Sequence, residues 1–203
     1  MHNRKILIIG EVYVDQHLDI IENGYSTSRL GGIFHAARSC DALNIEYALA
    51  YYAPDYLVKD VEKFGIDVLR ASSIFRLGKV DKAPNVMLIG QSDESGNQLY
   101  ENILGRQAEY VSMLPFMQVL DDFDPTDIII FPGRYGNAGI LSNLSNYEGK
   151  IHIDMNYDCD DILDLDTIKI QTVFLSTSST SFEEFFKEIS YDNLIKYFDK
   201  KNV

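Results

Sequence analysis

Several residues in this sequence have the types and spacing needed to bind a small polar molecule. Asp15 comes five residues after Gly10, which ends an apolar run, and its carboxylate can accept two hydroxyl groups at once. Gly31 and Gly32 open directly into a helical pattern that carries His35 in its first turn. Adjacent glycines favour a bend or a close approach of the main chain, and free N–H groups at a helix start bind anions and hydroxyl oxygens. These residues are predicted to line one edge of a small-molecule site.

Three further polar residues lie later in the chain. Asp154 and Asn156 come at the end of a predicted strand, where open α/β sheets bind ligands. Arg106 lies in a loop, and a guanidinium suits a phosphate or another anion. The sequence also allows plainer interpretations: an Asx-type turn at 154–156, a solvated Arg106, and structural roles for Asp15 and His35.

The elements that must position these residues alternate along the chain. Apolar runs predict parallel strands at 5–10, 46–52, 127–131, 151–155 and 172–175. Helical spacing predicts helices at 33–43, 56–64, 108–121, 138–144 and 181–189. Short alternating runs over 66–104, and a hairpin within 11–30 around Asn23-Gly24, are typical of antiparallel strands. The fold class predicted is a three-layer α/β/α sandwich with a mainly parallel sheet and a small antiparallel side sheet.

The composition narrows the classes of partner. The 203 residues carry a net charge of −13, which disfavours nucleic acid as a partner. Cys40 and Cys159 are far apart, so neither a disulfide framework nor a zinc site is indicated, and the carboxylates between 158 and 166 lack calcium-loop spacing. The apolar run at 6–9 is too short for a signal peptide or a membrane span. We expect a cytoplasmic protein without a bound metal.

These motifs together resemble the ribokinase family of carbohydrate kinases, also called the phosphofructokinase B (PfkB) type, over most of the chain. Gly10 with Asp15 resembles the family's first motif, whose acidic residue binds sugar hydroxyls from the base of a lid. Gly31-Gly32 resembles its di-glycine signature, and Asp154-Met155-Asn156 resembles the Asp-x-Asn beside the substrate and phosphate groups. The resemblance implies one ribokinase-like domain over 1–203, C-terminally incomplete, with lid segments 11–30 and 66–104.

The resemblance implies a transferase that phosphorylates a primary hydroxyl of a sugar or nucleoside, with ATP and Mg²⁺ in an intact enzyme. Asp15, Gly31, Gly32, His35 and Asn156 would bind the substrate, and Arg106 and Asp154 would contact phosphate or another anion. The family's glycine-rich anion hole with its catalytic Asp has no counterpart in these 203 residues, and 176–179 lacks the acidic residue associated with magnesium.

We therefore expect no catalytic residue and no cofactor in this chain alone. The expected role is the substrate-binding portion of such a kinase, alternatively a non-catalytic sugar-binding or assembly protein of the same fold. A homodimer through the lid sheet is a further expectation.

Overall fold

The computed structural model describes residues 4–22, 25–90, 94–95, 101, 105–131, 133, 135, 137–155 and 168–175. The predicted helix at 181–189 and the predicted site residue Asn156 lie outside these ranges. Within them, no helix is both long and apolar enough to cross a membrane.

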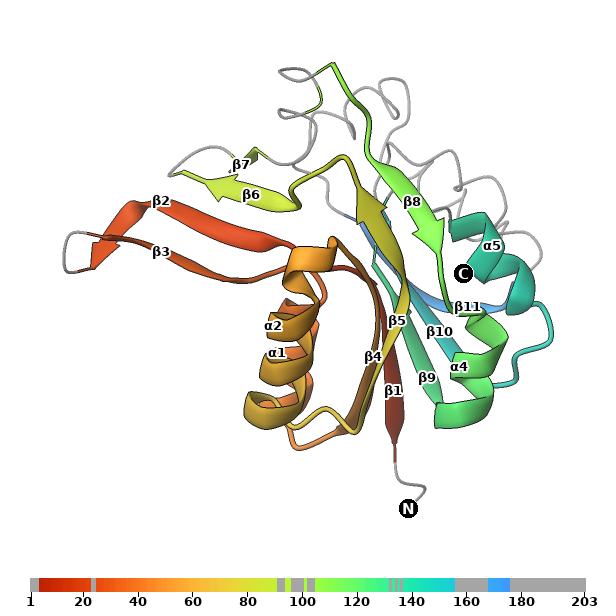
Figure 1. The fold of residues 1–203 in the computed structure, drawn as a ribbon. Helices are drawn as coiled ribbons and strands as arrows, with labels where there is room; N and C mark the ends of the chain where they lie inside the picture. Colours follow the sequence, from red (N-terminus) through yellow and green to blue (C-terminus); the bar gives the residue numbers. More distant parts are fainter. Residues whose placement is uncertain are drawn as a thin grey trace, which may run out of the picture.

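The main sheet has seven strands in the order β11-β10-β9-β1-β4-β5-β8 (Figure 1). Their bounds are Lys5–Glu11 (β1), Glu46–Ala53 (β4), Ser73–Asp81 (β5), Glu109–Ser112 (β8), Asp127–Ile130 (β9), Lys150–Met155 (β10) and Ile170–Leu175 (β11). All pairs are parallel except β5 with β8. The five predicted parallel strands and the fold class are confirmed.

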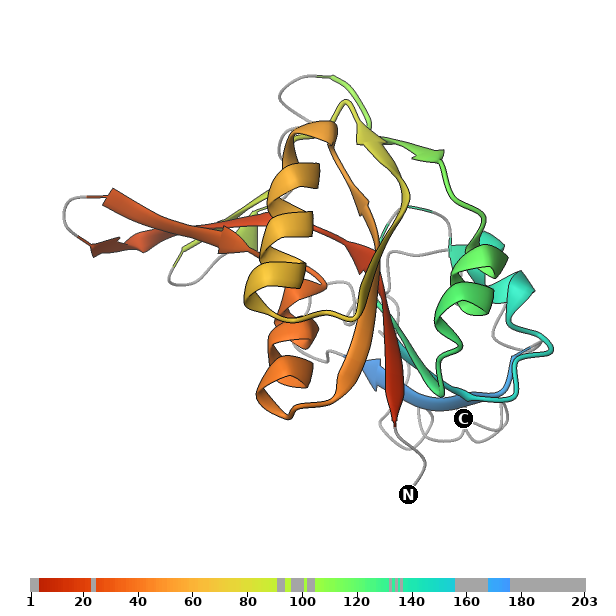
Figure 2. The ribbon, with the colours of Figure 1, turned by 60° about the horizontal axis from the view of Figure 1, so that its bottom comes forward.

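Helices cover both faces of this sheet (Figure 1 and Figure 2). One face carries α1 (Phe34–Ala42) and α2 (Val58–Lys63), and the other carries α4 (Phe116–Phe123) and α5 (Asn137–Asn143). Alternate residues of the central strands feed the two apolar layers, because successive side chains of a strand point to opposite faces. Ile6 and Ile8 pack with the α1–α2 layer, whereas Leu7 and Ile9 pack with the α4–α5 layer.

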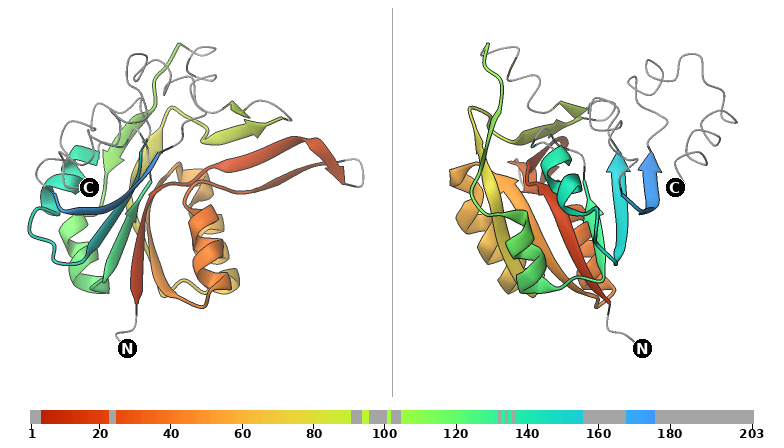
Figure 3. Two further views of the ribbon diagram at one scale, coloured as in Figure 1. Left: turned by 180° about the vertical axis from the view of Figure 1, so that it is seen from behind. Right: turned by 90° about the vertical axis from the view of Figure 1, so that its right-hand side faces the viewer.

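A second, smaller sheet stands off the carboxyl end of the main sheet, in the order β3-β2-β6-β7 (Figure 1 and Figure 3). Its strands are Val14–Glu22 (β2), Tyr25–Leu30 (β3), Val86–Ile89 (β6) and Glu94–Ser95 (β7). The β2–β3 and β6–β7 pairs are antiparallel, and β2 runs parallel to β6. The predicted hairpin within 11–30 is therefore present, and it projects on the side of α1 and α2.

Two sequence-based assignments are corrected. The predicted side-sheet segment 66–104 does not lie wholly in the small sheet, because β5 pairs in parallel with β4 in the main sheet. The predicted helix at 108–121 begins only at Phe116, and 109–112 forms β8 instead. Beyond β8, the amides of Met113 and Leu114 donate hydrogen bonds to the carbonyl of Leu77 in β5 (2.8 and 3.2 Å). Pro115 then precedes the first residue of the helix.

Candidate functional site

Asp15 lies where the small sheet joins the main sheet. It is the second residue of β2, stands opposite Arg29 of β3, and is only 3% exposed. Gly31 makes room for its carboxylate, since a β-carbon at position 31 would lie 2.0 Å from Asp15 Oδ1 and 2.4 Å from Oδ2. The first glycine of the pair is therefore required by a buried acidic side chain.

Gly32 has a different requirement. Its φ is +60°, in the left-handed region that favours glycine, and a β-carbon there would meet the carbonyl oxygen of Glu11 at 2.2 Å. That carbonyl accepts a hydrogen bond from the amide of Ile33 (3.1 Å), while the amide of Gly31 donates to the carbonyl of Tyr13 (2.8 Å). The two glycines thus hold the start of α1 against the chain between β1 and β2.

Two cationic or protonatable side chains approach the Asp15 carboxylate. His35 Nε2 lies 2.9 Å and Arg29 Nε 3.6 Å from Asp15 Oδ2, and both of these side chains are half exposed. Both are contacts at ion-pair distance, while Oδ2 is buried and accepts no hydrogen bond from the described part of the chain. A buried carboxylate oxygen without a donor is costly, so this atom is ready to accept one from a ligand.

Glu11 is a second buried carboxylate at this edge, and the sequence analysis did not single it out. It ends β1, is 2% exposed, and accepts hydrogen bonds from the Tyr13 hydroxyl (2.9 Å), the Tyr110 hydroxyl (3.0 Å) and the Asn85 amide (3.3 Å). Asn85 also donates to the Val12 carbonyl (3.0 Å). The local signal was available, because a carboxylate directly follows the apolar run of the central strand, where such sheets bind ligands.

Arg106 and Asp154, the other predicted site residues that the structure describes, lie apart from Asp15. Arg106 is exposed and lines an open hollow with Lys82, Glu101 and Glu109. Asp154 lies near the carboxyl end of β10, two strands away from β1 in the sheet, and burial raises the pKa of its carboxyl. The structure therefore brings together Asp15, Gly31, Gly32 and His35, and separates Arg106 from them.

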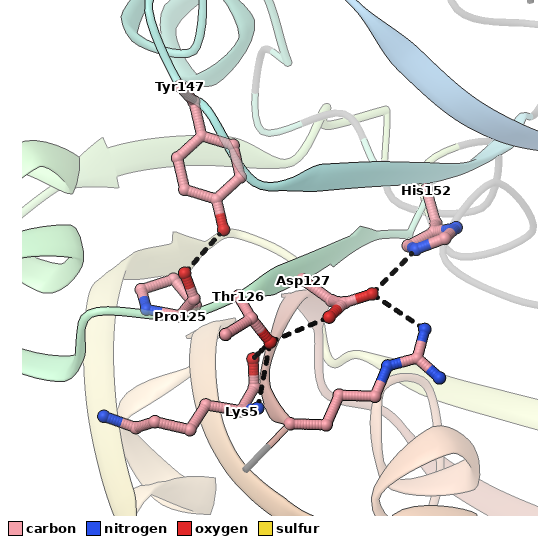
Figure 4. Close-up of polar contacts among 7 residues, drawn as sticks. Lys5, Pro125, Thr126, Asp127, Tyr147 and His152 are labelled. Carbon is pink, nitrogen blue, oxygen red and sulfur yellow. Dashed lines mark hydrogen bonds and ion pairs between the residues drawn. The ribbon is translucent and has the colours of Figure 1, made fainter. Parts of the chain in front are cut away.

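A polar cluster at the amino ends of the strands stabilises the fold and lies away from the predicted site (Figure 4). Asp127, the first residue of β9, receives hydrogen bonds from Arg4 (2.8 Å) and Thr126 (2.8 Å) and lies 3.3 Å from His152 Nε2. Burial alone would raise the pKa of Asp127, but the three partners outweigh burial and lower it to about 2. These residues occupy the amino ends of the strands, away from the edge where ligands bind.

The fold and the buried Asp15 beside a di-glycine turn define the chain as a protein with the ribokinase-like α/β fold. Solved structures similar to it include ribokinase from Giardia lamblia, at 14% identity and a TM-score of 0.62, with 98% of this chain and 65% of that chain covered. A 2-dehydro-3-deoxygluconokinase from Thermotoga maritima is 11% identical, with a TM-score of 0.59 and coverage of 99% and 69%.

A third structure similar to this chain is a pyrophosphate-dependent kinase in the ribokinase family, complexed with a pyrophosphate analog and myo-inositol. It is 14% identical, with a TM-score of 0.50 and coverage of 73% of this chain and 48% of that chain. The chain thus spans between about half and about 70% of the length of these three structures. No protein-family model and no curated protein matches the sequence.

Proposed function

We propose that this chain binds a polyhydroxylated small molecule, a sugar or a nucleoside, as the substrate side of a ribokinase-like kinase that phosphorylates a primary hydroxyl with ATP. The single observation that carries the proposal is the Asp15 carboxylate, buried against Gly31 with one oxygen that lacks a hydrogen-bond donor. A sugar hydroxyl supplies the missing donor, and a charge-assisted hydrogen bond of this kind is stronger than a neutral one.

Asp15 is 3% exposed, so a ligand reaches its carboxylate only if neighbouring groups move. The neighbouring side chains of Arg29 and His35 are each 50% exposed, so moving them costs little packing. His35 stands in the first turn of α1, where a displaced imidazole still reaches a ligand hydroxyl. In this proposal the small sheet acts as a lid, because its strand β2 carries Asp15 at the junction with the main sheet.

The described residues do not supply the nucleotide side of such a site. No three His, Cys, Asp or Glu side chains among them come together as ligands for a metal ion. Glu11 is engaged by Tyr13, Tyr110 and Asn85, and Arg106 lies in a separate hollow. These groups do not fit Mg²⁺ and ATP, so no step of phosphoryl transfer is assigned to them, and the proposal for this chain is confined to hydroxyl binding.

The proposal extends to assembly and location. A homodimer through the small sheet is supported by β3, which lies at the edge of that sheet and offers an outer row of backbone groups to a second copy. A cytoplasmic location is supported by Cys40, which is a free, buried thiol.

The test of hydroxyl binding is calorimetric titration of the chain with ribose, fructose, ketodeoxygluconate and adenosine. Asp15→Ala should weaken binding of the preferred compound by about 1.5 to 3 kcal/mol, the range for hydrogen bonds to a charged group. Asp41→Ala is the matched control, because this carboxylate pairs with Arg70 outside the site. Equal affinities in the wild type and Asp15→Ala would remove Asp15 from the site. Absence of binding by the wild type would reject the proposal for the chain.

A further inference from the structure

A notch under the small sheet lies beside the Asp15 site and shares Arg29 with it. It is an open cavity of about 440 Å³ between the β2–β3 hairpin and the helices α1 and α2. Val14 and Leu30, which face each other across the hairpin, line it together with Leu57. Because successive residues of a strand point to opposite faces, Val14 and Asp15 point away from each other. Its volume falls in the range of small-molecule pockets.

The charged residues of the notch are mostly cationic. Arg29, Arg38 and Lys63 line it, against a single carboxylate from Asp60. This excess of positive charge stands out in a chain whose net charge is −13. Arg29 is shared with Asp15, whereas neither Arg38 nor Lys63 forms an ion pair with any residue that the structure describes. The notch therefore attracts anions locally although the protein as a whole repels them.

The Arg38 side chain is fixed by two contacts, but not all of its N–H groups have a hydrogen-bond partner among the described residues. Its Nη2 donates a hydrogen bond to the carbonyl of Leu30 (2.7 Å), and its guanidinium carbon lies 5.6 Å from the centre of the Phe64 ring. Its Nη1 is buried and has no hydrogen-bond partner among the described residues. Burial, and secondarily the nearby charge of Arg29, lower the pKa of Arg38, and the charge of Asp15 opposes them in part. Arg38 lines the notch, so an anionic group there would pair with its guanidinium and relieve the repulsion between Arg38 and Arg29.

We propose that this notch is a second ligand site, for a small organic anion with a carboxylate or phosphate head group and a compact apolar body. The head group lies against Arg38, with Lys63 and Arg29 adding charge, and the apolar body packs on Val14, Leu30 and Leu57. A purely inorganic anion leaves the apolar walls uncovered, and a neutral apolar ligand leaves the cationic side chains of the notch without a counter-charge. The notch shares Arg29 with the Asp15 site, but the proposal does not rest on sugar binding, because Arg38, Lys63 and the apolar wall form no ion pair with Asp15.

The test uses phenyl phosphate and benzoate as probes, with inorganic phosphate as the head group alone and benzyl alcohol as the apolar body alone. Calorimetry should show one phenyl phosphate or benzoate bound per chain, at least tenfold more tightly than either fragment. Arg38→Gln should weaken binding by about tenfold, the effect of one charge-assisted hydrogen bond. Lys63→Gln should weaken it by about threefold, since an exposed charge contributes less. Arg70 lies outside the notch, so the Arg70→Gln variant should bind phenyl phosphate as tightly as the wild type does.

Control measurements make the outcome decisive. Arg38→Gln loses the bond to Leu30, so thermal unfolding must show that the variant is folded; the exposed Lys63 offers a second variant that leaves the packing intact. The proposal is overturned if the probes fail to bind, if they bind no better than inorganic phosphate, or if both variants bind as the wild type does. Loss of phenyl phosphate binding in Asp15→Asn but not in Arg38→Gln would assign the probe to the sugar site instead. If the probes do not bind and the protein is a dimer that the Lys63→Gln substitution dissociates, the notch is an interface between two copies of the chain.

Discussion

Protonation of Asp127 should weaken the fold in acid. Its folded-state pKa of about 2 lies below the ordinary value of 3.8, so its stabilising effect is fully present above about pH 4 and is lost as the pH falls through 2. The difference corresponds to about 2 kcal/mol of unfolding free energy at neutral pH. Asp127→Asn should lose most of this at pH 7, and its stability should vary less than that of the wild type between pH 4 and 2.

Urea unfolding at a series of pH values measures this effect. Asp122→Asn is the matched control, because this carboxylate is exposed on α4, and its removal should leave the pH dependence unchanged. A wild-type stability that stays constant from pH 4 to 2 would show that the hydrogen bonds from Arg4 and Thr126 do not stabilise the folded protein.

The contact between Gly31 and Asp15 makes a second prediction at the scale of single residues. The three atoms nearest to a β-carbon at position 31 all belong to the Asp15 carboxyl group, the closest at 2.0 Å. Gly31→Ala should therefore cost about 1 to 3 kcal/mol of stability, the usual range for overpacking. In an Asp15→Ala background the same substitution should cost much less, because the clashing atoms are gone.

A double-mutant cycle measured by urea unfolding gives this coupling energy directly. Gly32→Ala provides the contrast: its obstacle is the main-chain oxygen of Glu11, and its φ is positive, so the Asp15→Ala background should not rescue it. Additive effects of Gly31→Ala and Asp15→Ala would contradict the close packing of the two residues.

At the scale of elements, the sequence was sufficient for the parallel strands of the main sheet. A strand that is buried on both faces consists of consecutive apolar residues, as residues 6–9 of β1 do. Such a strand can therefore be recognised from the sequence of the segment alone. β5 was assigned to the wrong sheet because only three of its nine residues are buried and six are half-buried, so it lacks the continuous buried run of β1. Its parallel pairing with β4 decides that β5 belongs to the main sheet, and this pairing cannot be predicted from the sequence of β5 alone.

The site was predictable in part, for the same reason. The glycine pair and Asp15 form a compact motif, and the structure does place Asp15 against Gly31. Glu11 follows the apolar run of β1, but its hydrogen-bond partners could not be predicted from the neighbouring sequence, because two of its three donors lie 74 and 99 residues further along the chain. Those donors, Asn85 and Tyr110, come from the segment before β6 and from β8, so Glu11 ties both sheets to the end of β1. Such a cluster becomes visible only when the tertiary structure is known.

At the scale of the whole molecule, the proposed sugar binding needs fewer groups than a complete kinase reaction does. The described residues supply a buried carboxylate, Asp15, at the carboxyl edge of the main sheet, where the small sheet joins it. Phosphoryl transfer depends in addition on positioned groups that stabilise the transferring phosphate and on a base for the attacking hydroxyl. The 203 residues contain no glycine-rich Gly-Ala-Gly-Asp segment that could provide these groups.

We therefore predict that the 203-residue chain binds a sugar or nucleoside but does not transfer phosphate to it. Purified protein should show no turnover above background in a coupled assay with ATP, Mg²⁺ and the compound that binds best in calorimetry. The same assay with pyrophosphate as donor serves as a second arm, because one similar structure is a pyrophosphate-dependent kinase. Turnover that is lost in Asp15→Ala would refute this prediction, since the chain would then contain its own phosphate-stabilising groups. Turnover that Asp15→Ala leaves unchanged would point to a contaminating kinase, and repeated purification to constant specific activity decides between the two.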